Sequence, residues 1–436
     1  MYKRQGWNNA AATTCGNTYI KYHYSGGLET LAMMLAYYNY TQDSSFATNY
    51  VVPMAAQVIR FFNLHWPKTN GKLVFYPANA CEMYWSCTNP TDYIAGLQYD
   101  IQQLLALPSN LTTPALVSEW NSCLAALPSL PMDSTGTFVR PAQTFGAGMN
   151  SENPECYCIF PYRIFGLGLP NFNTGLATFN NRTVKNFKFD WSQDPIEEAL
   201  VGLTTAAQSD VINNFKDTDS TARFQAFWSS RNDYVPTEDT GGAAMSALQY
   251  MLMQCVGNKI MILPAWPAGW NVDFKLNAPG NTSVRLILQG GAITQLAVTP
   301  ASRAGDVVGD PPIRASAFNL ESGVQTENCA EGGLDVGYIN SGSYTAYNQI
   351  DLTGSTSFDA RVASAGAGGN IQIRLDSPTG TMIGTCAVPI TGGWQTWSTQ
   401  TCSIAPTTGS HTIYLVYTGG NGNGNLFNIE WFSFNL

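Results

Sequence analysis

The sequence predicts a multidomain protein in which a helical region comes first, a small antiparallel β region follows, and a β-sandwich ends the chain. Length is the first indication, because 436 residues exceed what one hydrophobic core usually organises. The second is a change at Lys259, where apolar residues spaced three and four apart give way to short β-like runs. The third is the stretch from about residue 313, which carries alternating strands, turn signals and no helical pattern.

The helical region, residues 1–257, contains three segments of helical character between residues 28 and 127: LETLAMMLAYYNY, VVPMAAQVIRFFNLHW and DYIAGLQYDIQQLLAL. Their apolar residues recur at spacings of three and four, as one face of a helix requires. We predict later helices at residues 195–207, with Asp194 as the N-cap and Pro195 at the first position, and at residues 242–255. The pattern indicates stacked helical hairpins.

Three regions complete the chain. Residues 258–301 contain the runs KIMILPAW, VDFKLNA, TSVRLILQ and AITQLAVTP between Gly, Pro and Asn turns, which predicts a small antiparallel sheet. Residues 302–312, SRAGDVVGDPP, are polar and without periodicity, as a linker should be. Residues 313–436 read as many short alternating strands, the pattern of a β-sandwich.

Composition excludes some classes of protein. Only 12% of residues are charged while 40 are Gly, a balance that suits an extracellular protein with a neutral polar surface. A net charge of -9 offers no basic footprint for nucleic acid, and no run of about 18 apolar residues predicts a membrane span. Four N-x-S/T sequons agree with a secretory route: Asn39, Asn110, Asn181 and Asn281. We therefore expect a secreted, extracellular glycoprotein; the N-terminus lacks a signal-peptide core, so either the signal was removed or the start is missing.

Ten cysteines are scattered along the chain without CxxC pairs and without His at zinc-ligand spacing. We therefore expect no metal site and interpret the cysteines as disulfide partners. Cys386 and Cys402 flank the Trp-rich segment of two adjacent predicted strands and are the first choice of pair, whereas Cys156 and Cys158 are too close in sequence to bond each other.

The final region carries five ordered blocks: GVQTEN, GGLDVGYINSGSY, IRLDSPTGTMIGT, GGWQTWST and NLFNIEWFSF. Together they resemble a family 6 carbohydrate-binding module, a jelly-roll sandwich. The resemblance implies that a sugar ring is held between Tyr338 and Trp394, with Asn425 and Glu327 bonding its hydroxyls. The chemistry fits, because a pyranose has an apolar face that stacks on aromatic rings and rim hydroxyls that need amide or carboxylate partners. The alternative is a core role, which we expect for Trp397 and Trp431.

The same resemblance implies a structural calcium ion held by an acidic opening strand, I-x-A-E, and an acidic final residue. Here the opening reads Ile313-Arg314-Ala315-Ser316, and Asn435 stands near the end. We therefore expect no calcium there, with Arg314 supplying the positive charge, since a guanidinium can bridge polar groups without a metal.

The region from residue 22 to 299 resembles, more distantly, the C-terminal half of the (α/α)6-barrel glycoside hydrolases of family 95. The blocks are GGLETLAMMLAYYNYT, GKLVFYPANACEMYW, TNPTDYIAGL, NPECYCIFPYRIFG, EDTGGAAMSALQYMLMQ and KIMILPAWPAGW. This implies an (α/α)6 toroid, complete or partial, with Glu82 as the general acid and Asp239, or its rival Glu238, activating water. Two water-holding Asn residues of that family find no counterpart here, as if the chain began after them.

Residue chemistry leaves alternatives open. Glu82 lies among aromatic residues that would favour its protonated form, but it could instead cap a helix, as could Asp239. Glu29, Glu152 and Glu155 sit at comparable junctions.

The sequence thus favours a monomeric glycoside hydrolase without cofactor that acts by inversion on a polysaccharide or oligosaccharide. The alternatives are a non-catalytic binding protein and a truncated, inactive fragment. A lyase is disfavoured, because 21 Lys and Arg and 3 His offer few groups to neutralise a uronate.

Overall fold

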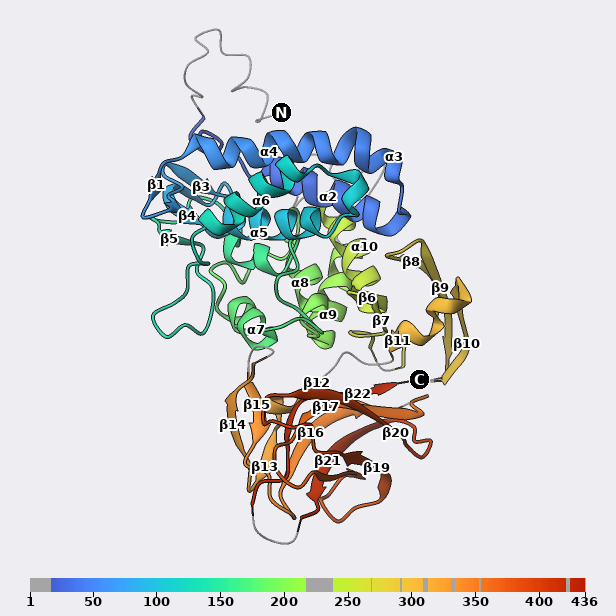
Figure 1. Ribbon diagram of the computed structural model, residues 1–436. Coiled ribbons are helices and arrows are strands. Elements are labelled where there is room, and N and C mark those ends of the chain that lie inside the picture. Colours follow the sequence, from blue (N-terminus) through green and yellow to red (C-terminus); the bar gives the residue numbers. More distant parts are fainter. Residues whose placement is uncertain are drawn as a thin grey trace. The chain divides into compact units, whose positions relative to one another are not determined.

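The computed structural model describes residues 17–216 and 238–435, apart from residues 268, 291, 309–312, 331–333, 353 and 421–423. The chain forms two compact units (Figure 1). The first comprises Met1–Gly166, Phe172–Leu248 and Pro279–Asn281; the second comprises Leu167–Asn171, Gln249–Ala278 and Thr282–Leu436.

The first unit begins with helices. The elements are α2 (Gly26–Thr41), α3 (Ser44–Phe46), the π-helical turn η1 (Ala47–Val51), α4 (Val52–His65), α5 (Thr91–Leu105) and α6 (Pro114–Ala126). Of these, α2, α4 and α5 lie where the apolar spacing predicts them, whereas α3, η1 and α6 were not predicted. Leu28, Leu31 and Leu35 form the buried stripe of α2, which packs against α5. Thr113 caps α6 by accepting a hydrogen bond from the backbone N–H of Leu116, and a proline begins that helix.

Short strands connect these helices. They are β1 (Lys68–Thr69), β2 (Lys72–Leu73), β3 (Ala78–Ala80), β4 (Tyr84–Pro90) and β5 (Ala142–Thr144). β3, β4 and β5 form a small antiparallel sheet. The tight turn between β3 and β4 contains Glu82, and the positive φ of 47° at Cys81 produces its bend.

The later helices are α7 (Phe172–Asn181), α8 (Asp194–Leu200), α9 (Thr204–Phe215) and α10 (Asp239–Leu252). The single helix expected at residues 195–207 is two helices, because Gly202 adopts a left-handed φ of 73° after α8. The expectation for Asp194 was also wrong: Gln193 occupies the N-cap position, and Asp194 is the first helical residue. Helical and β regions are both present, whereas closure into an (α/α)6 toroid stays a prediction.

The small β region consists of two three-stranded sheets. β6 (Met253–Val256) and β7 (Lys259–Ile262) form a hairpin, beside which β11 (Val307–Val308) runs parallel to β7. β8 (Val272–Ala278), β9 (Thr282–Gln289) and β10 (Ala292–Thr299) form an antiparallel meander. The segment expected as a linker, 302–312, contains most of the 3₁₀ helix η5 (Ala301–Asp306) and all of β11; its residues 309–312 lie outside the described part.

The C-terminal region is a sandwich of two antiparallel sheets, as the strand pattern predicts (Figure 1). One sheet has the order β14–β15–β22–β17–β20, with β12 also on β22, and the other has the order β13–β16–β21–β18–β19. The strands are β12 (Ile313–Arg314), β13 (Leu320–Ser322), β14 (Gln325–Asn328), β15 (Leu334–Gly337), β16 (Tyr344–Asp351), β17 (Ser357–Ala363), β18 (Gly369–Leu375), β19 (Met382–Val388), β20 (Trp397–Ser403), β21 (Ser410–Thr418) and β22 (Asn428–Asn435). The 3₁₀ helix η6 (Ala315–Ala317) follows β12.

Alternate residues of each strand face the core between the sheets. Phe358, Ala360 and Val362 are buried on β17, while Phe432 and Phe434 pack their rings against it from β22. Trp397 and Trp431, expected in the core, are only half-buried. The centre of the sandwich is filled by phenylalanine, tyrosine and aliphatic side chains.

Candidate functional site

Two large aromatic side chains on loops of the sandwich are exposed instead of joining its core. Tyr338 directly follows β15 and is 45% exposed, and Trp394, between β19 and β20, is 36% exposed. The backbone of Tyr338 has a positive φ of 56°, which a non-glycine residue adopts only where the surrounding structure compensates its cost. Both residues proposed to stack on a sugar are therefore available to a ligand.

Two glycines make room for this arrangement. A Cβ atom at Gly366 would lie 2.8 Å from Cη2 of Trp394 and 2.3 Å from the carbonyl oxygen of Asn425, so the indole is seated directly over bare backbone. A Cβ atom at Gly337 would lie 3.1 Å from both Glu327 Oε1 and Asn428 Oδ1. Glycine at these positions allows the Trp394 ring and the Glu327 carboxylate to pack as they do.

Asn428, buried at the start of β22, joins the segments that carry the site. Its Nδ2 atom lies 2.6 Å from Glu327 Oε1 on β14, 3.2 Å from the carbonyl oxygen of Trp394 and 3.4 Å from Asp335 Oδ1. Through this amide, the structure brings Glu327 and the Trp394 loop together beside Gly337, the neighbour of Tyr338. Asn425 lies half-buried just before β22.

Three residues of this network were not singled out from the sequence: Asp335, Gln395 and Asn428. Gln395 Nε2 donates to Asp335 Oδ2 at 2.8 Å, and Gln395 Oε1 accepts from the backbone N–H of Ala330 at 2.6 Å. Burial raises the pKa of Asp335 to about 6; the hydrogen bond from Gln395 opposes this, and the negative charge of Glu327 adds to it. The only signal in the sequence was their position inside the same blocks as Tyr338, Trp394 and Asn425.

Arg314 lies on β12 and pairs with Glu430 on β22 through its guanidinium. Both side chains are largely buried, at 13% and 3% exposure. The carboxylate at this place is therefore already neutralised by a cation of the protein itself, so the residues present do not fit a divalent metal there. The side chain of Asn435 lies outside the described part.

Residues 314–436 match the model of carbohydrate-binding module family 6. The C-terminal sandwich is a family 6 module. It is 42% identical over 129 residues to an arabinoxylan arabinofuranohydrolase from Paenibacillus polymyxa, a match that covers 28% of this chain and 20% of that protein. It is 40% identical over 119 residues to endo-1,4-beta-xylanase A from Thermoclostridium stercorarium, covering 25% of this chain and 23% of that one.

A solved structure of a family 6 module from Clostridium cellulolyticum in complex with xylose is 52% identical, covering 29% of this chain and 96% of that chain with a TM-score of 0.28. This chain thus spans about a fifth of the length of the curated relatives that it matches. Those similarities concern the family 6 module and not the helical unit.

In the helical unit, the turn between β3 and β4 presents Glu82 half-buried at the surface. Its backbone N–H donates to Glu152 Oε2 at 2.6 Å, and Asn150 Nδ2 lies 3.5 Å from Glu82 Oε2. The indole N–H of Trp85 donates to the carbonyl oxygen of Glu82 at 2.9 Å. The turn is therefore fixed by partners on both sides, and its backbone contacts a second acidic residue, Glu152.

A buried acid lies behind this turn. Asp92, at the start of α5, accepts a hydrogen bond from the backbone N–H of Cys81 at 3.3 Å and is fully buried. Burial raises the pKa of Asp92 well above its ordinary value, Cys81 opposes this, and the charges of Glu29 and Glu152 raise it further. Burial therefore favours the protonated form of Asp92, a residue that the sequence analysis did not name.

Glu29 belongs to the same neighbourhood because its charge acts on Asp92, and hydrogen bonds hold its side chain. Ser25 Oγ donates to Glu29 Oε1 at 2.8 Å, and His23 Nε2 lies 2.7 Å from Ser25 Oγ. We call Glu29, Glu82, Asp92 and Glu152 the acidic group. Glycoside hydrolysis uses a pair of carboxyl groups, one as acid and one as base or nucleophile, and such a set offers several side chains for these roles.

Other candidate acids lie elsewhere. Asp239 is exposed as the first residue of α10, with Glu238 exposed beside it, and the assignment of either as the base stays a prediction. Glu155 Oε1 accepts from the backbone N–H and the hydroxyl of Thr183, at 2.7 and 2.9 Å. Glu155 therefore has a structural role between η3 (Pro154–Cys158) and the segment after α7.

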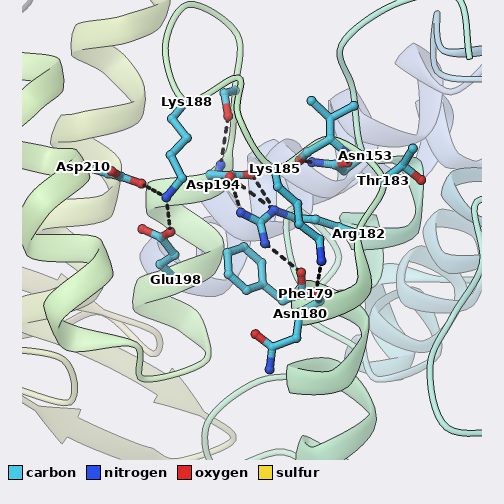
Figure 2. Close-up of polar contacts among 12 residues, drawn as sticks. Asn153, Phe179, Asn180, Arg182, Thr183, Lys185, Lys188, Asp194, Glu198 and Asp210 are labelled. Carbon is cyan, nitrogen blue, oxygen red and sulfur yellow. Dashed lines mark hydrogen bonds and ion pairs between the residues drawn. The ribbon is translucent and has the colours of Figure 1, made fainter.

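Figure 2 shows a second set of charges, the ion-pair network of Arg182, Lys188, Asp194, Glu198 and Asp210. Arg182 forms a bidentate pair with Asp194, with Nη2 2.6 Å from Oδ2, and its guanidinium lies 3.8 Å from the ring centroid of Phe179. Lys188 Nζ lies 3.0 Å from Glu198 Oε1 and 2.6 Å from Asp210 Oδ2. This network ties the segment after α7 to α8 and α9, and it engages Asp194 with Arg182 at the start of α8.

Two searches of the described part of the chain gave negative results. No group of three or more His, Cys, Asp and Glu side chains there is arranged to hold a metal ion. No helix in that part is sufficiently long and apolar to cross a membrane.

Proposed function

We propose that this chain is a secreted glycoside hydrolase whose family 6 module anchors it to a polysaccharide. The observation that carries the proposal is the exposure of Tyr338 and Trp394 on loops joined through Asn428 to Glu327. Aromatic rings stack on the apolar face of a sugar, while Glu327 and Asn425 supply acceptors and donors for its rim hydroxyls. Tethering raises the local substrate concentration at the helical unit.

The first ligand class to test is a xylan-type polymer. Two relatives of the module are named as an arabinoxylan arabinofuranohydrolase and an endo-1,4-beta-xylanase, and a 52% identical module was solved with xylose. A neutral β-linked polymer also suits a site whose described groups are aromatic, amide and carboxylate, without a cation to pair with a uronate.

Binding is tested by affinity electrophoresis of the full chain in gels that contain soluble arabinoxylan. Trp394→Ala should abolish retardation with the circular dichroism spectrum unchanged, because stacking is lost without opening the core. Ile390→Ala is the matched control: this side chain is 63% exposed on the same loop but has no ring, so its removal should leave retardation intact. Equal retardation of Trp394→Ala and the parent would place the ligand elsewhere.

For the reaction, we propose hydrolysis of an O-glycosidic bond by inversion with Glu82 as the general acid. Support comes from the acidic group around Glu82 and from relatives that carry the module on hydrolases. In this scheme a carboxylate activates water across the bond, with Asp239 the residue proposed from the sequence and Glu152 the one that the structure brings next to Glu82.

Glu82→Gln should lower turnover by about 10²–10⁴-fold with substrate binding retained, because the amide keeps the shape of the acid but cannot give up a proton. Glu119→Gln alters only an ion pair with Arg60 on α4 and should leave turnover unchanged. Proton NMR of the first product should show inversion at the anomeric carbon. Retention would require a nucleophilic carboxylate and would overturn the scheme; a chain that binds but hydrolyses no glycan in a broad panel would be a binding protein instead.

A further inference from the structure

We propose that Asp335 and Gln395, which lie behind the sugar-binding residues, hold the Trp394 loop and Glu327 in position. Acidification should then loosen the Trp394 loop and lower the affinity of the site for saccharide. The part concerning affinity rests on the proposed function of the module, whereas the positioning of the loop does not.

Hydrogen-bond polarity fixes the direction of this network. The backbone N–H of Ala330 can only donate, so the carbonyl oxygen of Gln395 must face it, at 2.6 Å. The NH₂ group of Gln395 is thereby turned to Asp335 Oδ2, at 2.8 Å. Asp335 must accept on that oxygen, and its other oxygen faces the NH₂ group of Asn428 at 3.4 Å. Both polar neighbours therefore require an acceptor.

The same network reaches the two sides of the binding site. Gln395 is the residue next to Trp394, and Asn428 holds both the carbonyl oxygen of Trp394 and the carboxylate of Glu327. Asp335 is fully buried and directly opposite Glu327 in the β14–β15 pairing, so it has no direct access to a ligand. Its effect on binding must pass through Gln395, Asn428 and Glu327, which makes it a positioning residue.

Protonation of Asp335 conflicts with this arrangement. A carboxylic acid brings a donor among donors, whereas the amides of Gln395 and Asn428 both need an acceptor there. A proton on Asp335 also removes its charge beside Glu327, the carboxylate that Asn428 holds. Of the described titratable groups, Glu327 on β14 and the thiol of Cys329 act on Asp335, whereas the Trp394 loop and β22 contribute the amides of Gln395 and Asn428. Loss of the contact from Asp335 to Gln395 or to Asn428 should loosen the Trp394 loop, because Gln395 adjoins Trp394 and Asn428 holds the Trp394 carbonyl oxygen.

The pH range follows from burial and the neighbouring charge, which raise the pKa of Asp335 to about 6. Above about pH 7 the residue is ionised and the network is complete; below about pH 5 it is mostly protonated. If only the ionised form holds the site, affinity falls up to about tenfold between pH 7 and pH 5, in proportion to the ionised fraction.

The first arm of the test needs no ligand. Hydrogen exchange of the full chain, corrected for intrinsic rates, is measured for the peptide spanning residues 389–396 at pH 7.5 and pH 5. The parent should lose protection at pH 5. Asp335→Asn keeps an acceptor for Gln395 but cannot titrate, so its protection should be equal at both pH values. Asp359→Asn, on β17 of the same sheet with a partner hydroxyl at Thr401, should behave as the parent.

The second arm measures binding of soluble arabinoxylan over the same pH range. The parent and Asp359→Asn should weaken up to about tenfold and Asp335→Asn should not. Equal loop protection of the parent at both pH values, or an equal loss in Asp335→Asn, would overturn the inference. Absence of arabinoxylan binding at any pH together with pH-dependent loop protection would overturn the proposed ligand and uphold the positioning role.

Discussion

Replacing Arg314 by Met should destabilise the sandwich strongly, although this residue is not one of the proposed ligand contacts. The guanidinium is the ion-pair partner of Glu430, whose side chain is only 3% exposed. Methionine fills much of the same volume but leaves the carboxylate buried without that cation. Removing one partner of a buried pair costs about 3–5 kcal/mol, because the remaining charge has lost water as well as its counter-ion.

The assay is hydrogen exchange of the full chain, read from peptides of β22 and β17. A change of 3–5 kcal/mol in opening free energy corresponds to roughly two to three and a half orders of magnitude in exchange rate. The control is Arg285→Met. Arg285 pairs with Asp273 at 3.0 Å, but the side chains are 47% and 54% exposed, so its loss should change the opening of β8 and β9 by less than about 1 kcal/mol.

A second variant separates charge from packing. Adding Glu430→Leu to Arg314→Met removes the buried carboxylate that has lost its cation and should restore most of the protection. If Arg314→Met changes exchange no more than Arg285→Met does, or if the double variant is worse than the single one, the buried pair is not what holds β12 to β22.

Three further predictions concern other parts of the chain. The thiols of Cys386 and Cys402 are unbonded but interact between β19 and β20, so their disulfide stays a prediction. Oxidised protein should yield a peptide pair linked through these residues, and two alkylated thiols after air oxidation would refute the pairing. Arg182→Met should raise exchange in α8 about 100-fold or more by orphaning Asp194, whereas Arg60→Met, at an exposed pair, should not. Burial and Asp210 raise the pKa of Glu198 to about 8 from 4.5, so its contribution to stability is greatest below about pH 4.5 and is lost as pH rises to about 8. Glu198→Gln should flatten the dependence of the urea midpoint on pH between about 4.5 and 8. An unchanged slope would mean that another group causes the pH dependence.

The sequence predicted best what depends on local periodicity. Phe358, Ala360 and Val362 alternate inward on β17, and Leu28, Leu31 and Leu35 form the stripe of α2, because one-sided burial imposes the period of each element. The break after α8 was missed, since Gly202 can continue a helix or end it and only tertiary packing decides.

The candidate sites were predictable only in part, for a related reason. Tyr338 and Trp394 could be named because they stand in sequence blocks that resemble the family 6 module. Three residues could not be named from the sequence: Asp335, Asn428 and Asp92. Asp335 and Asn428 contact each other across 93 residues of chain, and the role of Asp92 depends on its complete burial. Polar residues inside strands and at helix starts usually serve structure, so no local signal separates these from the rest.

Gly366 places a limit on how this module can diversify. The floor beneath the indole of Trp394 is backbone, with no space for even one methyl group between the ring and the Asn425 carbonyl. Changes in ligand preference, whether by natural drift or by a laboratory library, therefore have to arise from residues beside the ring. In a library randomised at Gly366, most modules should no longer bind saccharide. Gly366→Ala therefore offers a way to abolish binding by the module without altering the charge or polarity of its surface.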